Sequence, residues 1–257
     1  MTQRIDSSGS GYLSYRNVAG LQFPKLTLAM RSLLLRSITG GFAALALVAP
    51  TFASTCAGTP ANGRVQHAVA LPTTGVNFGP YTQLGAQLGR TFVHATVRDI
   101  VVAAYHGLEQ EQPGVEYIYG ETGLRLGGPM PPHRTHRNGT SVDFMVPVRL
   151  ADGRPATLPR SAANRYGYDA EFDSEGRLDG LQIDFVAIAA HLQQLDQHAR
   201  RHGAGIARVI FDPALTRKLF DTPSGALLAK LPFMKAKPWV RHDEHYHVDF
   251  AVRCTPG

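Results

Sequence analysis

Apolar residues recur at helical spacing in two stretches of the chain. The first stretch starts at Thr96, which forms an expected capping pair with Asp99, and Pro113 stops it. The second stretch follows Asp184, a candidate cap, and ends at Gly203. The predicted apolar faces consist of Val97, Ile100, Val101, Ala104, Tyr105 and Leu108 in the first helix, and of Phe185, Ile188, Ala189, Leu192, Leu195 and Ala199 in the second.

Several further apolar runs have the length and composition of β-strands. They span 115–120, 141–148, 205–211 and 239–252. A hairpin is predicted from 166–172 and 177–183 around the polar turn 173–176. We expect loops with short strands in 54–92 and short helices in 214–231. Because runs of strands and helices do not alternate regularly, the predicted class is α+β, with a largely antiparallel central sheet flanked by helices.

The beginning of the chain is typical of an export leader. A basic segment at 30–36 precedes an apolar segment at 41–48, and small residues allow cleavage after Ala53. The apolar segment is too short to span a bilayer, and no later run approaches the ~18 apolar residues of a membrane helix. The predicted organisation is a spurious N-terminal extension at 1–29, a signal peptide at 30–53 and a single domain at 54–257. The mature protein is then periplasmic or secreted, without stable membrane insertion.

The formal net charge of +6 overstates how basic the mature domain is. Residues 1–53 carry five basic side chains and one acidic side chain, and their removal leaves 21 basic and 19 acidic side chains. A net charge of +2 without a Lys/Arg cluster interleaved with aromatics does not indicate a nucleic-acid partner. At 257 residues with 44% apolar side chains, the chain is long enough to bury one sizeable core.

Cys56 and Cys254 stand at opposite ends of the predicted mature domain. An oxidising compartment favours their pairing, although a free or differently paired thiol is the alternative. Their bridge would close a loop of about 200 residues, which chain-entropy models value at roughly 4–5 kcal/mol. Such a disulfide would fasten both termini to the domain.

Histidines are concentrated in two widely separated segments of the sequence. The segment 133–143 holds His133, His136 and Asp143, with Gly139 between them to let the backbone turn. The segment 242–247 holds His242, Glu244, His245 and His247. Imidazole and carboxylate are ligands that zinc prefers, and a catalytic zinc takes three of them.

The spacing of the second segment adds a geometric expectation. Residues two apart in a strand point the same way, so His245, His247 and Asp249 are expected on one face of the sheet. The predicted site is therefore a hydrolytic metal site at the sheet, and a structural metal site or a hydrogen-bond network is the alternative. Single histidines elsewhere are expected to be structural, and His191, His198 and His202 are expected on or just after the second helix, off its apolar face.

The two segments resemble a known family, the penicillin-insensitive murein endopeptidases, within the wider group of lysostaphin-type and D-Ala-D-Ala zinc peptidases. The family pattern His-x-x-His-x-x-Gly-x-x-x-Asp is met by 133–143, and His-x-x-His-x-His is met by 242–247. The resemblance implies that Zn²⁺ is bound by His136, Asp143 and His247. It also implies that His245 is a general base or transition-state stabiliser. By the same resemblance His133 and His242 line the site and hold substrate or ligands.

The sequence departs from the pattern at Thr140-Ser141, where the family suggests Leu-Asp, and it has fewer cysteines. Glu244 rivals His245 as the base, because D-Ala-D-Ala peptidases of this group carry a Glu three residues before the last ligand. We favour His245, which would neighbour a ligand on the same strand face.

The resulting prediction is an exported zinc metallopeptidase that hydrolyses cross-links between peptidoglycan peptides, with the D-alanyl–diaminopimelate bond as the expected target. One alternative is a zinc-binding cell-wall module without turnover. Others are a D,D- or L,D-carboxypeptidase of the same group and a metal-dependent phosphoesterase, which usually needs more carboxylates and often two metals.

Overall fold

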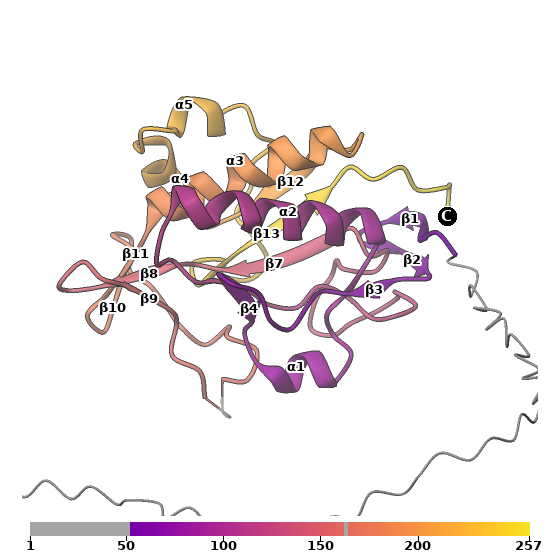
Figure 1. The fold of residues 1–257 in the computed structure, drawn as a ribbon, viewed down its shortest axis with the longest axis horizontal. Coiled ribbons are helices and arrows are strands. Elements are labelled where there is room, and N and C mark those ends of the chain that lie inside the picture. The colour runs from indigo at the N-terminus through magenta and orange to yellow at the C-terminus, as the bar shows by residue number, and fades with distance from the viewer. Residues whose placement is uncertain (1–51, 162–163) are drawn as a thin grey trace, which may run out of the picture. The chain divides into compact units, whose positions relative to one another are not determined.

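The computed structural model describes residues 52–161 and 164–257, drawn as a ribbon in Figure 1. The predicted extension at 1–29 and nearly all of the predicted leader at 30–53 lie outside these ranges, so both stay predictions. None of the helices in 52–161 and 164–257 combines the length and apolar character that crossing a bilayer requires.

The centre of the fold is a sheet of five strands in the order β12-β13-β7-β6-β4. Strands β4 and β6 are parallel, and the other neighbours are antiparallel. This arrangement, with helices beside it, confirms the predicted α+β class and its largely antiparallel sheet. The strands are β4 (Phe78–Pro80), β6 (Tyr117–Tyr119), β7 (Ser141–Met145), β12 (Ile206–Ile210) and β13 (His245–Phe250).

Two long helices, α2 (Ala95–Glu111) and α3 (Phe185–Arg201), lie side by side along the sheet (Figure 1). The prediction for α3 is confirmed, since the Asp184 side chain accepts a hydrogen bond from the Ala187 amide. The predicted cap of α2 is wrong. The helix begins one residue earlier, and His94 Nδ1 accepts the Thr96 amide instead. The short helices are α1 (Gln83–Gln87), α4 (Pro213–Phe220) and α5 (Gly225–Leu228).

The remaining strands form small sheets around the central one. A sheet of four strands has the order β10-β11-β8-β9, and two further pairs are β1-β2 and β3-β5. These strands are β1 (Thr55–Thr59), β2 (Asn62–Gln66), β3 (Val69–Ala70), β5 (Phe92–Val93), β8 (Val148–Leu150), β9 (Pro155–Ala156), β10 (Arg177–Leu178) and β11 (Leu181–Ile183).

The predicted hairpin between 166–172 and 177–183 is wrong. The observed hairpin lies within 177–183, where β10 pairs with β11 across Asp179-Gly180. Both turn residues have positive φ, 45° and 82°, as a two-residue type I′ turn requires. Residues 166–172 form no strand and run instead to the candidate site described below.

Strands β7 and β13 have two chemically different faces because side chains alternate along a strand. Phe144 and Tyr246 are directly opposite each other and contact His191 of α3, so this face meets the helices. Asp143 and His247 are the next opposite pair and point to the other face of the sheet. One alternating pattern therefore supplies both the core and a buried polar cluster.

His191 contradicts the expectation that it lies off the apolar face of its helix. It is fully buried, because it follows Ile188 by three residues and precedes Leu195 by four, on the same face. The ring stacks on Tyr105 at 5.0 Å, and His191 Nδ1 lies 2.5 Å from the Tyr246 hydroxyl. Burial lowers the pKa of His191 to about 3, so the ring is neutral in the folded protein.

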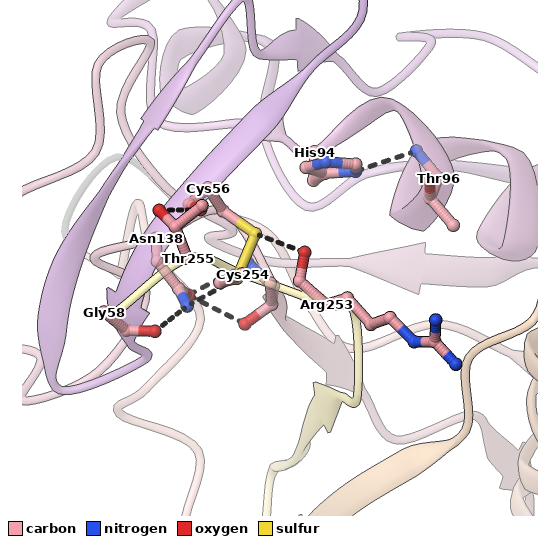
Figure 2. Close-up of a disulfide and its surroundings, with 9 residues drawn as sticks. Cys56, Gly58, His94, Thr96, Asn138, Arg253, Cys254 and Thr255 are labelled. Atoms are coloured by element: carbon pink, nitrogen blue, oxygen red, sulfur yellow. Dashed lines mark hydrogen bonds between the residues drawn. A yellow bond between two sulfur atoms is a disulfide. The ribbon is translucent and has the colours of Figure 1, made fainter. Parts of the chain in front are cut away.

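The predicted disulfide between Cys56 and Cys254 is present and spans 198 positions of the sequence. Figure 2 shows Asn138, in the first histidine segment, beside this bridge. The Asn138 amide lies 3.5 Å from both Gly58 O and Cys254 Sγ, and its Oδ1 accepts the Thr140 hydroxyl at 2.7 Å. The bridge thus fastens both ends of the domain next to the turn that leads into β7.

We predict that His191 makes the fold acid-sensitive. Its pKa of about 3 in the folded protein is below the value of ~6.5 in the unfolded chain, so its stabilisation is complete above pH 6.5 and is lost as pH falls. Compared with His191→Phe, the wild-type protein should lose about 3 kcal/mol more unfolding free energy between pH 7 and pH 4. Urea unfolding at both pH values measures this difference, and parallel losses in the two proteins would contradict it.

Candidate functional site

The pairing of β7 with β13 brings the two histidine segments together. His247 is directly opposite Asp143, and His247 Nδ1 lies 2.8 Å from Asp143 Oδ1. His136 approaches the same oxygen from the loop before β7, with its Nε2 at 3.3 Å. All three side chains are almost completely buried. Three candidate ligand atoms, two from the segment 133–143 and one from 242–247, therefore converge on one point.

The orientation of His136 leaves one ring nitrogen without a proton. His136 Nδ1 donates to the Thr122 carbonyl at 3.1 Å, because a carbonyl can only accept. Burial lowers the pKa of His136, which keeps the ring neutral, and the lone pair of Nε2 then faces Asp143. Among the hydrogen bonds of 52–161 and 164–257, buried Nε2 has no partner. The backbone of His136 has φ 67°, a conformation that a non-glycine residue keeps only where surrounding contacts impose it.

A second carboxylate, that of Asp249, contacts the ring nitrogen of His247 that does not face Asp143. His247 Nε2 lies 2.8 Å from Asp249 Oδ1, which also accepts the Ser141 hydroxyl at 2.6 Å. Arg208 Nη2 pairs with the other Asp249 oxygen at 2.6 Å. Asp249 therefore sets the orientation of His247, as the sheet-face carboxylate expected from the sequence. Ser141, where the sequence departs from the family pattern, supports Asp249.

The charges of this cluster favour a bound cation. Burial lowers the pKa of His247, but Asp249 and the hydrogen bonds of Asp143 and Asp249 outweigh that effect and raise it to about 10. Burial would raise the pKa of Asp143, but the surrounding histidines, with the hydrogen bond from His247 among them, hold it well below its usual range. A proton on His247 Nδ1 thus balances the buried Asp143 carboxylate, and a metal ion at this point would replace that proton.

The donor set fits a metal such as zinc. Two imidazole nitrogens and one carboxylate oxygen make the three-ligand set typical of a catalytic zinc. The lone pair of His136 Nε2, buried without a partner in the described chain, is the observation that most directly indicates a cation site. His133, His136 and Asp143 also form a group that could hold a metal ion, with ligand atoms all within 4.8 Å of one another. The two sets share His136 and Asp143 and differ in His133 or His247.

The contacts of His133 separate these two sets. His133 Nε2 hydrogen-bonds Glu121, whose other oxygen pairs with Arg90. His133 Nδ1 lies 3.7 Å from Asp143 Oδ2, the oxygen that does not face His136 and His247. His133 therefore faces the outer oxygen of Asp143, whereas His247 contacts the oxygen that His136 also faces. This shared oxygen is the reason that we favour the set with His247.

His245 and Glu244 form a buried pair in the wall of the site. His245 Nδ1 lies 2.9 Å from Glu244 Oε1, so Nε2 is the ring nitrogen left to exchange protons. Burial lowers the pKa of His245 to about 4 and raises that of Glu244 to about 9. Glu244 Oε2 also accepts the Asp243 amide at 3.2 Å. Glu244 is thus placed to orient His245, whichever of the two serves as the base.

A cavity of ≈ 400 Å³ opens over these groups. His242 lines it, and its Nδ1 donates to the Val240 carbonyl at 3.0 Å, so Nε2 is free. Its ring lies 4.5 Å from that of His245, and burial lowers the pKa of His242 to about 4. Trp239 stands at the rim with 37% of its surface exposed, and the Arg134 guanidinium lies 5.7 Å from its ring centre. The exposed part of its lining combines Trp239 and Val240 with the charged Glu171 and Arg241, and the buried part carries the polar groups described above.

The sequence analysis missed two residues of the site. Tyr168 lines the cavity, and its hydroxyl donates to Asp143 Oδ2 at 2.9 Å. Burial raises the pKa of Tyr168 well above its usual value, so the hydroxyl keeps its proton. Glu121 holds His133 and is 4% exposed. Neither lies in a histidine segment, and the Tyr-Ile-Tyr-Gly strand just before Glu121 is the one local signal that could have located it.

Comparison with known proteins gives the family of this chain. A family model described as penicillin-insensitive murein endopeptidase matches residues 56–257, well over half of the chain. The chain therefore belongs to that family, which makes it a peptidase of the peptidoglycan cell wall. No curated protein matches the chain. The match covers all the site residues described above and confirms the resemblance seen in the two segments.

We predict one zinc ion per chain, with His247 and not His133 as the third ligand. His247→Ala should weaken zinc affinity by far more than the roughly 10–100-fold that is typical of residues contacting a ligand. His133→Ala should stay within that range, because its ring nitrogens face Glu121 and the outer oxygen of Asp143. Competition with a chromophoric chelator measures both affinities. A larger loss for His133→Ala than for His247→Ala would reverse the assignment.

Proposed function

We propose that this member of the penicillin-insensitive murein endopeptidase family is an exported, zinc-dependent endopeptidase, and that it hydrolyses the D-alanyl–diaminopimelate cross-link of peptidoglycan. The observation that carries the proposal is the convergence of His136 Nε2, Asp143 Oδ1 and His247 Nδ1 below an open cavity. The disulfide and the leader-like sequence support a periplasmic or secreted location.

In this proposal, His136, Asp143 and His247 hold zinc, which when bound supplies Lewis-acid polarisation of the scissile carbonyl and acidifies a water molecule. The chain contributes the rigid placement of those ligands. The Thr122 carbonyl orients His136, and Asp249 orients His247, so little reorganisation accompanies the reaction.

His245 is the proposed group that moves protons. Its Nε2 accepts the proton of the attacking water and returns it to the leaving amine. Glu244 Oε1, 2.9 Å from Nδ1, accepts the Nδ1 proton and so keeps Nε2 as the nitrogen that exchanges protons. Both residues considered as the base thus take part in the proposed mechanism, with His245 as the base and Glu244 as the residue that orients it.

The remaining cavity residues are proposed to hold the substrate. His133 and His242 both line the cavity. His242 binds the Val240 carbonyl through Nδ1, which leaves Nε2 for the substrate, whereas His133 binds Glu121 through Nε2 and faces Asp143 Oδ2 with Nδ1. Trp239 offers an exposed apolar surface at the mouth, against which the stem peptide can pack. A pure binding module has no use for a buried His–Glu pair in its cavity wall, which favours turnover over the non-catalytic alternative.

Purified cross-linked muropeptide dimers test the proposal directly. The mature protein from Ser54 should convert dimers into monomers, and conversion should stop after chelation and return with added zinc. His136→Ala should be inactive while its circular dichroism remains that of the wild type. If dimers stay intact although one zinc is bound per chain, the endopeptidase assignment is wrong. Release of a terminal D-alanine from monomers would instead indicate a carboxypeptidase.

We predict that His245 and Glu244 differ in their contribution to the rate. His245→Ala should lower kcat by about 10²–10⁴-fold, the usual contribution of a positioned acid–base group. Glu244→Gln keeps a hydrogen-bond acceptor for Nδ1 and should lose less. His202→Ala, on the exposed end of α3, is the matched control. Zinc content should be unchanged in all three variants. A larger loss for Glu244→Gln than for His245→Ala would make Glu244 the base.

A further inference from the structure

We infer that Tyr168 is a positioning residue for Asp143: its hydroxyl holds the carboxylate so that one oxygen alone is presented to the metal. The inference rests on the proposed metal site but not on the proposed peptidase activity. Tyr168 belongs to neither histidine segment, and it lies in the irregular segment 164–176 between β9 and β10.

The two oxygens of Asp143 have separate surroundings. Oδ1 faces His136 Nε2 at 3.3 Å and His247 Nδ1 at 2.8 Å, which makes it the oxygen at the convergence point. Oδ2 accepts the Tyr168 hydroxyl at 2.9 Å. The other close donor, His133 Nδ1, is 3.7 Å from Oδ2, beyond hydrogen-bond distance. The hydroxyl of Tyr168 is thus the group that satisfies this buried oxygen.

The ring of Tyr168 is fixed between the two histidine segments. It lies edge-on to His133 at 5.4 Å between ring centres, and edge-on to His245 at 4.9 Å. Packed between these two rings, Tyr168 directs its hydroxyl to Asp143 Oδ2. Tyr168 therefore contacts both histidine segments, through His133 of the first and His245 of the second.

The backbone after Tyr168 is also anchored to the second histidine segment. The Phe172 amide donates to Asp243 Oδ2 at 2.6 Å, and Arg241 Nη2 donates to the Phe172 carbonyl at 2.6 Å. Arg241 pairs with Asp243 at 2.5 Å, which closes the network. An irregular segment thereby gains a fixed position, and Tyr168 becomes a donor of defined geometry.

Loss of the hydroxyl has a specific physical consequence. A buried carboxylate oxygen without a hydrogen bond is costly, so Asp143 would rotate to satisfy Oδ2 elsewhere or would turn both oxygens to the metal. Either change moves Oδ1 from the point shared with His136 and His247. Removing a group that orients a metal ligand typically costs about 10–100-fold in metal affinity.

The test is zinc binding by Tyr168→Phe, measured without substrate by competition with a chromophoric chelator. Tyr166→Phe is the matched control, since Tyr166 lies two residues away and packs under the Arg90 and Arg165 guanidinium groups rather than at the site. We expect a Kd for zinc about 10–100-fold weaker in Tyr168→Phe and unchanged in Tyr166→Phe. The circular dichroism of the metal-free proteins should be the same, which separates positioning from a general loss of structure.

Activity at saturating zinc completes the test. Tyr168→Phe should recover most of the wild-type kcat once zinc is in excess, with KM unchanged. An unaltered zinc Kd in Tyr168→Phe overturns the inference, and so does a kcat that stays low at saturating zinc, because the hydroxyl would then act on the substrate. Wild-type protein that binds zinc but cleaves no dimer would overturn the proposed function and leave the role of Tyr168 standing.

Discussion

The antiparallel register of β7 against β13 is the constraint on which the rest of the structure depends. It places His247 opposite Asp143 on one face, and Tyr246 opposite Phe144 on the other. Because the side-chain period of a strand is two, a slip by one residue would exchange the two faces. The core under α2 and α3 and the polar cluster above the sheet are therefore specified together. The Cys56–Cys254 bridge and Asn138 support this register at the turn that leads into β7.

Burial of Asp143 explains the polar arrangement around it. A carboxylate removed from water needs compensating charge and hydrogen bonds, and Oδ1 meets His247 Nδ1 while Oδ2 meets the Tyr168 hydroxyl. Each surrounding histidine is oriented by its own partner: Thr122 for His136, and Asp249 for His247. The result is a set of preoriented side chains at the proposed cation site. The same logic extends to His245, whose partner is Glu244.

Local sequence patterns predicted the elements that depend on neighbouring residues. Helical periodicity located α2 and α3, and strand alternation placed Asp143 in a strand and His136 in the loop before it. The spacing of the histidines indicated the family. The hairpin was misplaced because the Asp179-Gly180 turn was overlooked. The burial of His191 follows from its position on the apolar face of α3. Its hydrogen-bond partner, the Tyr246 hydroxyl, is 55 residues away in the sequence, so local spacing does not indicate it. Tyr168 has no such local signal, and Glu121 has only the strand before it, since the folded chain alone brings these residues to Asp143 and His133.

The central proposal is a cation site formed by His136 Nε2, Asp143 Oδ1 and His247 Nδ1. A crystal structure of the zinc-loaded protein, with anomalous scattering measured at the zinc edge, tests it most directly. The account predicts a single anomalous peak about 2.0–2.2 Å from each of these three atoms, with Asp143 bound through one oxygen. A peak coordinated by His133 in place of His247, or no peak between β7 and β13, would contradict it.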